Sequence, residues 1–158
     1  MLGWFTSHPF DDPVLGRLVR SRRLWRGSIL LAGTAIPLSL AGTRRAPDPD
    51  AIAAARALPA TWAANREAVT RALVDYLDAY ESAVADHVIA PCAGPDPVIA
   101  QASDVWRFVE IESASVTCFG DTLVAEVALR TSWDDEHTQG ARFAGGRFVE
   151  FNASIAPA

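Results

Sequence analysis

Residues 62–84 limit the fold more than any other stretch, because they carry an apolar stripe at helical spacing. The apolar residues Trp62, Val69, Leu73, Leu77, Tyr80 and Val84 recur at helical spacing, with seven positions between the first two and three or four between the others. Charged residues occupy the positions between them, among them Arg66, Glu67, Arg71, Asp75, Asp78 and Glu81. Such a pattern predicts an amphipathic helix with one face that must be buried. We therefore expect this helix to pack on one face of a sheet.

Segments with strand character lie on both sides of this helix. Before it they cover residues 14–20, 24–31 and 35–41, and after it residues 106–111, 113–119, 122–132, 141–143 and 147–155. The turn signals Gly120-Asp121 and Gly145-Gly146 separate several of them. The sequence therefore predicts an α+β fold in the order βββ-αα-ββββ. We expect a mostly antiparallel sheet of about 6–7 strands with the helices packed on one face.

Proline and aspartate residues suggest where these elements begin and end. Asp48 or Asp50 is a suitable cap for a helix over residues 51–58. Pro59 is expected to break or restart that helix, with Thr61 as a second cap. Pro37 cannot donate a hydrogen bond to a neighbouring strand, so its strand should be an edge strand or pair on one side there. Residues 87–104, rich in proline and glycine, are expected to form a long loop.

Composition and charge narrow the classes of function. The chain has 158 residues, so we expect one domain over residues 1–158. The net charge of −5 argues against a nucleic-acid partner, because clustered positive charge drives phosphate binding. The apolar stretch 28–42 is too short for a membrane span, and Gly33 and Pro37 interrupt it. We expect buried strands there, no membrane association and a cytoplasmic protein, with Cys92 in a loop and Cys118 in a strand, both reduced.

The segment Trp133–His137 concentrates more polar chemistry than any other part of the sequence. It contains Trp133, Asp134, Asp135, Glu136 and His137. The acids and the imidazole could ligate a divalent metal. Alternatively, Glu136 could hold His137 in one tautomer for acid–base catalysis. In a third interpretation the segment is structural, with the aspartates capping turn amides, His137 bonding a backbone group and Trp133 packing on the helices.

Geometry favours the structural interpretation over the metal site. Adjacent residues of an extended chain point to opposite faces, so Glu136 and His137 would converge only if the backbone turns between them. His8 and His87 make no recognised ligand spacing with His137. We therefore predict no metal and no cofactor, and keep Glu136 and His137 as the catalytic candidates should the protein be an enzyme.

A second polar segment lies in the first strands. Arg17, Arg20, Arg22, Arg23 and Arg26 alternate in part with apolar residues. We interpret them as a solvated sheet face, because surface charge runs usually mark such faces. The alternative is a docking patch for an acidic partner.

Two motifs resemble those of a group of small uncharacterised bacterial proteins. The first is Phe10-Asp11-Asp12-Pro13-Val14-Leu15-Gly16, followed by Trp25-Arg26-Gly27, and the second is Trp133-Asp134-Asp135-Glu136-His137-x-x-Gly140. The resemblance spans most of the chain and implies a cytoplasmic α+β domain of unknown function. Some small domains of this kind occur beside toxin genes and are suspected immunity or binding proteins. The resemblance brings no catalytic residue with it, and this chain has Asn152-Ala153-Ser154 where Asn-Gly-Ser is expected.

Three hypotheses follow from the sequence. The first is a non-catalytic binding or immunity-type protein with an acidic surface for a protein partner, contacted through residues 133–137. The second is a small metal-assisted enzyme that uses Glu136 and His137. The third is a structural module, either a monomer or a homodimer formed through an edge strand. We rank the binding protein first.

Overall fold

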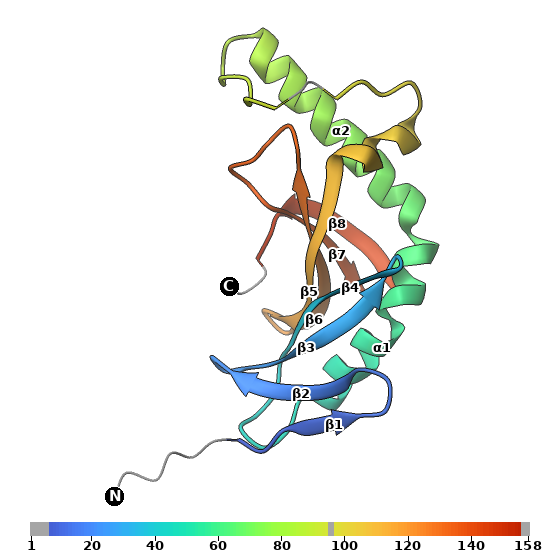
Figure 1. Cartoon of the computed structure of the whole chain (residues 1–158), viewed down its shortest axis with the longest axis vertical. Coiled ribbons are helices and arrows are strands. Elements are labelled where there is room, and N and C mark those ends of the chain that lie inside the picture. The colour runs from blue at the N-terminus through green and yellow to red at the C-terminus, as the bar shows by residue number, and fades with distance from the viewer. Residues whose placement is uncertain (1–6, 95–96, 156–158) are drawn as a thin grey trace, which may run out of the picture.

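The computed structural model describes residues 7–94 and 97–155 and is built on one curved sheet (Figure 1). The strands are β1 (Phe10–Asp12), β2 (Gly16–Ser21), β3 (Leu24–Leu31), β4 (Thr34–Leu40), β5 (Val109–Phe119), β6 (Thr122–Thr131), β7 (Gln139–Ala144) and β8 (Arg147–Ala153). Their order in the sheet is their order in the chain. Every neighbouring pair is antiparallel except β4 and β5, which pair in parallel. The predicted α+β class and mostly antiparallel sheet are confirmed, with eight strands in place of about 6–7.

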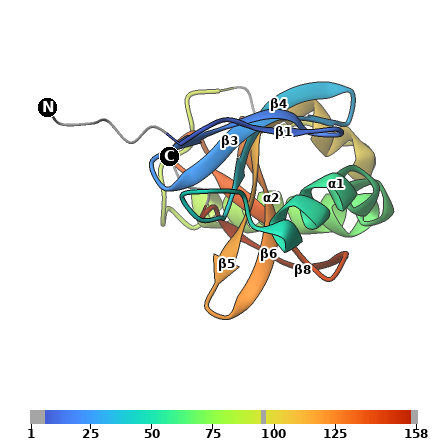
Figure 2. The ribbon, with the colours of Figure 1, turned by 90° about the horizontal axis from the view of Figure 1, so that it is seen from below.

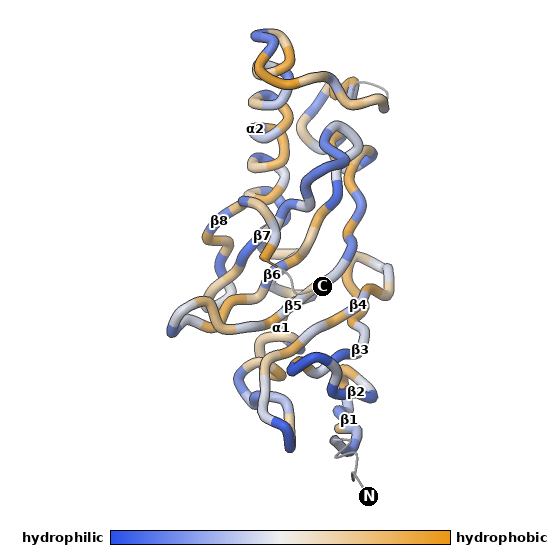
Figure 3. The backbone as a smooth tube through the Cα atoms, turned by 90° about the vertical axis from the view of Figure 1, so that its left-hand side faces the viewer, coloured by the Kyte–Doolittle hydropathy of each residue, from blue (hydrophilic) through white to orange (hydrophobic). Residues whose placement is uncertain are grey.

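The helices form the long connection between β4 and β5. They are α1 (Pro49–Ala64), α2 (Arg66–Ala85) and the short 3-10 helix η1 (Ala102–Phe108). Helix α1 lies against β3, β4, β5 and β6, whereas α2 extends beyond the sheet and contacts η1 and β8 (Figures 1 and 2). Hydrophobic and hydrophilic segments alternate along α2, as its spacing predicts (Figure 3). The apolar stripe over residues 62–84 is therefore divided between two helices. Its first residue, Trp62, lies on α1, which packs on the sheet, whereas the rest of the stripe lies on α2, which contacts η1 and β8.

The boundary between these helices is at Asn65 and not at Pro59, so the predicted break at Pro59 is wrong. Pro59 lies inside α1, and Asp48 caps that helix by accepting hydrogen bonds from the amides of Asp50 and Ala51. A proline inside a helix removes one backbone hydrogen bond and costs about 3 kcal/mol. Burial of Leu58 and Trp62, which are 1% and 3% exposed, offsets that cost.

Asn65 fixes the junction of the helices to the far end of the sheet. Its side-chain amide donates to the carbonyls of Thr61 (2.8 Å) and Gly146 (3.0 Å). Its Oδ1 accepts a hydrogen bond of 3.1 Å from the amide of Phe148. The β7–β8 turn therefore sets the angle at which α2 leaves α1.

Several strand predictions are confirmed and others need correction. Pro37 pairs with β3 only, because the parallel pairing of β4 with β5 begins at Leu38. The segments 106–111 and 113–119 are not two strands. Residues up to 108 form η1, and β5 continues through a register shift between Ile111 and Ser113. Strand β1 was not predicted, because at three residues it is too short to show a period.

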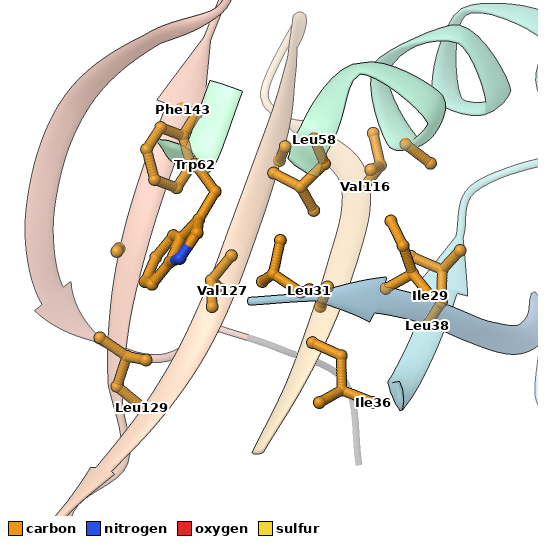
Figure 4. Close-up of a cluster of buried hydrophobic side chains, with 14 of the residues drawn as sticks. Ile29, Leu31, Ile36, Leu38, Leu58, Trp62, Val116, Val127, Leu129 and Phe143 are labelled. Carbon is orange, nitrogen blue, oxygen red and sulfur yellow. The ribbon is translucent and has the colours of Figure 1, made fainter. Parts of the chain in front are cut away.

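The main core lies between α1 and the inner face of the sheet (Figure 4). It includes Ile29, Leu31, Ile36, Leu38, Leu58, Trp62, Val116, Val127, Leu129 and Phe143. The apolar stretch 28–42 supplies β3 and β4 to this core, as expected. Among the described residues, no helix is long and apolar enough to cross a membrane. Phe10 packs against the core, while the other aromatic residues near the start, Trp4 and Phe5, lie outside the described residues.

The expected loop 87–104 is shorter than predicted, because η1 begins at Ala102. Its described residues before Ala102 form no helix or strand. Cys92 lies in this loop and Cys118 in β5, as predicted, and both thiols are free.

Candidate functional site

The segment Trp133–His137 forms the loop between β6 and β7, beside α2. Trp133 is 2% exposed and its ring lies 6.1 Å from that of Tyr76 on α2. Its indole nitrogen has no hydrogen-bond partner among the described residues. Asp135, Glu136 and His137 are exposed. The loop thus has a buried apolar base and a polar rim.

Asp134 holds the loop together. Its carboxylate accepts hydrogen bonds from the hydroxyl of Tyr76 and from the amides of Glu136 and His137, both at 3.2 Å. It also contacts Nδ1 of His137 at 3.0 and 3.1 Å. Tyr76 in turn accepts a hydrogen bond of 3.0 Å from the side chain of Gln139 at the start of β7. One carboxylate therefore links the loop to both α2 and its own following residues.

These contacts shift the ionisation of the groups that make them. Burial alone would raise the pKa of Asp134, but hydrogen bonds from Tyr76 and His137 outweigh it and lower that pKa. The hydrogen bond and negative charge of Asp134 raise the pKa of His137. Burial and then the Asp134 carboxylate raise the pKa of the Tyr76 hydroxyl above its ordinary value. At neutral pH Asp134 is therefore ionised and Tyr76 is a neutral donor.

A pocket of about 430 Å³ lies beside the loop. It is lined by the loop itself, by Tyr80 of α2 and by residues 89–93. The hydroxyl of Tyr80 accepts a hydrogen bond of 2.6 Å from the amide of Cys92, which holds the 89–93 segment against α2. The pocket brings Cys92 and His137 to one cavity, a juxtaposition with no signal in the sequence, since 45 positions (137 − 92) separate them.

The structure brings together a different pair from the one predicted. The partner of His137 is Asp134, three residues earlier, and not Glu136. The reason is the turn of the backbone, in which the Asp134 carboxylate accepts from the next two amides and meets the imidazole. Among residues 7–94 and 97–155, no group of three or more His, Cys, Asp and Glu side chains is placed to hold a metal ion. The capping role foreseen in the structural interpretation is the one that Asp134 takes.

Asp12, in the first of the two motifs, also has a role in the fold. Oδ1 of Asp12 accepts hydrogen bonds of 2.9 Å from the amides of Val14 and Leu15, which makes the β1–β2 turn. The same carboxylate binds Arg56 of α1 and is 1% exposed. Gly16 follows with a φ of 71°, a conformation that favours glycine. Asp12 thus anchors the first hairpin to α1.

The glycines of the motifs leave room for neighbouring side chains. A Cβ on Gly27 would lie 2.6 Å from Cδ2 of Leu18. A Cβ on Gly140 would lie 2.5 Å from Oε2 of Glu126. Glu126, buried on β6, accepts from Arg142 Nε at 2.7 Å and from Ser154 Oγ at 2.6 Å. The sequence analysis did not predict the ion pair between Glu126 and Arg142. The sequence signal for it is one acidic residue, Glu126, among the apolar residues in the middle of β6.

A curved sheet of consecutively ordered strands, with helices inserted between β4 and β5, defines the chain as an α+β protein. Residues 14–154 match DUF6985, a domain of unknown function, and the chain belongs to this family. No curated protein and no solved structure matches the chain.

Proposed function

We propose that this chain is a non-catalytic bacterial binding protein of the immunity type, which acts as a single cytoplasmic domain and sequesters a protein partner through an acidic surface. The observation that carries the proposal is that the acidic residues of the Trp133–His137 loop differ in their contacts. Asp134 is occupied by contacts within the molecule, whereas Asp135 and Glu136 are exposed and form no ion pair among the described residues. These two carboxylates are therefore available to a partner.

The neighbouring surface of α2 has the same sign of charge, whereas Arg107 and Arg130 line a second pocket together with Asp135. The sequence contains no Arg or Lys from residue 72 to residue 106. The exposed acids from residue 72 to the end of α2 and just after it are Asp75, Asp78, Glu81 and Asp86. Helix α2 also ends here, and it has no basic residue in its last turn to balance the negative end of its dipole. This end of the molecule therefore attracts a basic surface.

Exposed apolar residues accompany these charges. Val88 is 74% exposed and Ile89, which lines the pocket beside the loop, is 41% exposed. An apolar centre with a charged rim is the usual composition of a protein–protein interface. The partner that fits is a protein with a basic surface and an apolar side chain for the pocket.

The experiment is a binding measurement with the product of the neighbouring gene. We expect Asp135→Asn with Glu136→Gln to weaken the complex by roughly tenfold, mainly through slower association, because rim charges act on the encounter rate. The matched control is Asp121→Asn with Glu67→Gln, which removes the same charge from exposed positions elsewhere and should leave binding unchanged. Equal loss in both double variants would contradict the proposed site.

A second candidate, a small metal-assisted enzyme that uses Glu136 and His137, is favoured by one observation, the presence of both residues at a pocket. Their geometry gives it little support, because Asp134 and not Glu136 orients the imidazole. Elemental analysis of the purified protein separates the two functions. Stoichiometric metal, lost together with an activity on addition of a chelator, would favour the enzyme.

A further inference from the structure

The end of the molecule away from the acidic surface carries a compact group of arginines. We call Arg22, Arg23, Arg44 and Arg45 the arginine patch. All four are exposed, and none forms an ion pair among the described residues. The sequence from residue 14 to residue 47 contains no Asp or Glu. Four cations without an ion pair among the described residues therefore lie on these loops, and the nearest acid in the sequence, Asp48, is occupied as the cap of α1.

The two loops that carry the arginine patch are fixed side by side. Arg22 and Arg23 form the β2–β3 turn, and Arg44 and Arg45 lie between β4 and α1. The carbonyl of Thr43 accepts hydrogen bonds from Nε of Arg20 at 3.1 Å and from Nε1 of Trp25 at 3.0 Å. The side chains on either side of the first turn thus hold the start of the second loop. The two pairs of arginines therefore belong to two loops that these hydrogen bonds hold next to each other.

The β2–β3 turn adopts a conformation that arginine disfavours. Arg22 and Arg23 have φ values of 48° and 73°. The other two-residue turns with positive φ at both positions are Ala32-Gly33 and Gly145-Gly146, each with glycine at the second position. Of these three described turns, the β2–β3 turn is the one in which neither of the two positions is a glycine. Strained residues of this kind persist chiefly where the side chain has a function.

We propose that the arginine patch binds an acidic segment of a protein partner. The planar guanidinium groups suit carboxylates, which they can bind through two parallel hydrogen bonds. The adjoining outer face of the sheet favours a polypeptide over a nucleic acid. There Val19, on β2 three residues before Arg22, is 48% exposed, so the β2–β3 turn borders an apolar side chain. The net charge of −5 also opposes a long polyanion that would extend beyond the patch.

The test uses a variant that removes the charges and improves the turn. Asn-Gly is the preferred sequence for a two-residue turn with positive φ at both positions, so Arg22→Asn with Arg23→Gly keeps the hairpin. We expect the full-length double variant to unfold about 2–4 °C above the natural chain. It should also bind a fluorescein-labelled oligoglutamate peptide roughly tenfold more weakly at low salt, as measured by fluorescence anisotropy.

A matched control removes two arginines from elsewhere on the surface. Arg71→Ala with Arg147→Ala produces the same change in net charge and should bind the peptide like the natural chain. The proposal is overturned if the natural chain does not bind the peptide, if the turn variant binds it equally well, or if the control loses as much affinity. Tighter binding of a single-stranded oligonucleotide of equal charge through the same arginines would replace the protein partner with a nucleic acid. These outcomes do not depend on Asp135 or Glu136, so this proposal can fail while the proposed function stands.

Discussion

Gly140 lies directly under the carboxylate of Glu126, so closely that a Cβ at position 140 would meet Oε2 at 2.5 Å. We predict that Gly140→Ala destabilises the protein by about 1–3 kcal/mol, because the buried carboxylate would have to move away from Arg142 and Ser154. Urea unfolding measures the change. Gly120→Asn is a suitable control, because the surroundings of Gly120 are open and asparagine tolerates its positive φ. A loss in the control as large as that in Gly140→Ala would contradict the steric explanation.

The pair Asp12–Arg56 makes a pH-dependent contribution to stability. The hydrogen bond from Arg56 lowers the pKa of Asp12 from 3.8 to about 2, against the opposing effect of burial. Because the folded state has the lower pKa, the stabilisation is fully present above the unfolded pKa and is lost as the pH falls towards 2. We predict that Asp12→Asn costs about 1–3 kcal/mol at neutral pH. The difference from the natural chain, followed by urea unfolding, should shrink between about pH 4 and pH 2.

His137 should titrate above the ordinary histidine value of 6.5, because Asp134 contacts its Nδ1. The folded state has the raised pKa, so this contact stabilises the fold below 6.5 and stops doing so as the pH rises through the raised value. We predict that Asp134→Asn moves the pKa of His137 back towards 6.5 in an NMR titration. Glu136→Gln is the comparison. A larger shift in Glu136→Gln than in Asp134→Asn would show that the sequence-based pairing was right after all.

Tyr76→Phe tests whether α2 positions the candidate site. The change removes the hydroxyl that donates to Asp134 and accepts from Gln139. We predict a destabilisation of about 1–3 kcal/mol, because the half-buried carboxylate of Asp134 and the buried side chain of Gln139 each lose a partner. Tyr80→Phe, which removes only the acceptor for the Cys92 amide, should cost less. Equal costs measured by urea unfolding would mean that the contact with Asp134 contributes little.

The sequence predicts the fold better than it predicts the candidate site, because local patterns carry the fold. The period of two in residues 35–41 and the Gly145-Gly146 turn depend on near neighbours, and both correspond to elements of the structure. By contrast, helix α1 continues past Pro59 because Leu58 and Trp62 are buried in the core. Helix propensities describe single residues and do not contain this tertiary contribution.

The segment Trp133–His137 was chosen as a candidate from the sequence, but the contacts that its residues make were not predicted. Tyr76 is 58 positions from Asp134, and nothing in either segment marks the other as its partner. The sequence therefore could not distinguish the acid that the fold uses from the acids that remain exposed. Only the turn of the backbone after Asp134 makes that distinction.

The consecutive order of the strands has a consequence for how the chain folds. Strands β1–β4 and β5–β8 are two meanders in which every pairing is made through a short connection, so each can form from local contacts. Among the described residues, the sheet joins them where Leu38, Ser39 and Leu40 of β4 meet Ala114, Ser115 and Val116 of β5, with one more hydrogen bond from the amide of Ala41 to the carbonyl of Val116. That parallel pairing must close a loop containing both long helices, which costs more chain entropy than any hairpin. We expect the β4–β5 pairing to form last. The docking of the two preformed meanders would then limit the rate of folding.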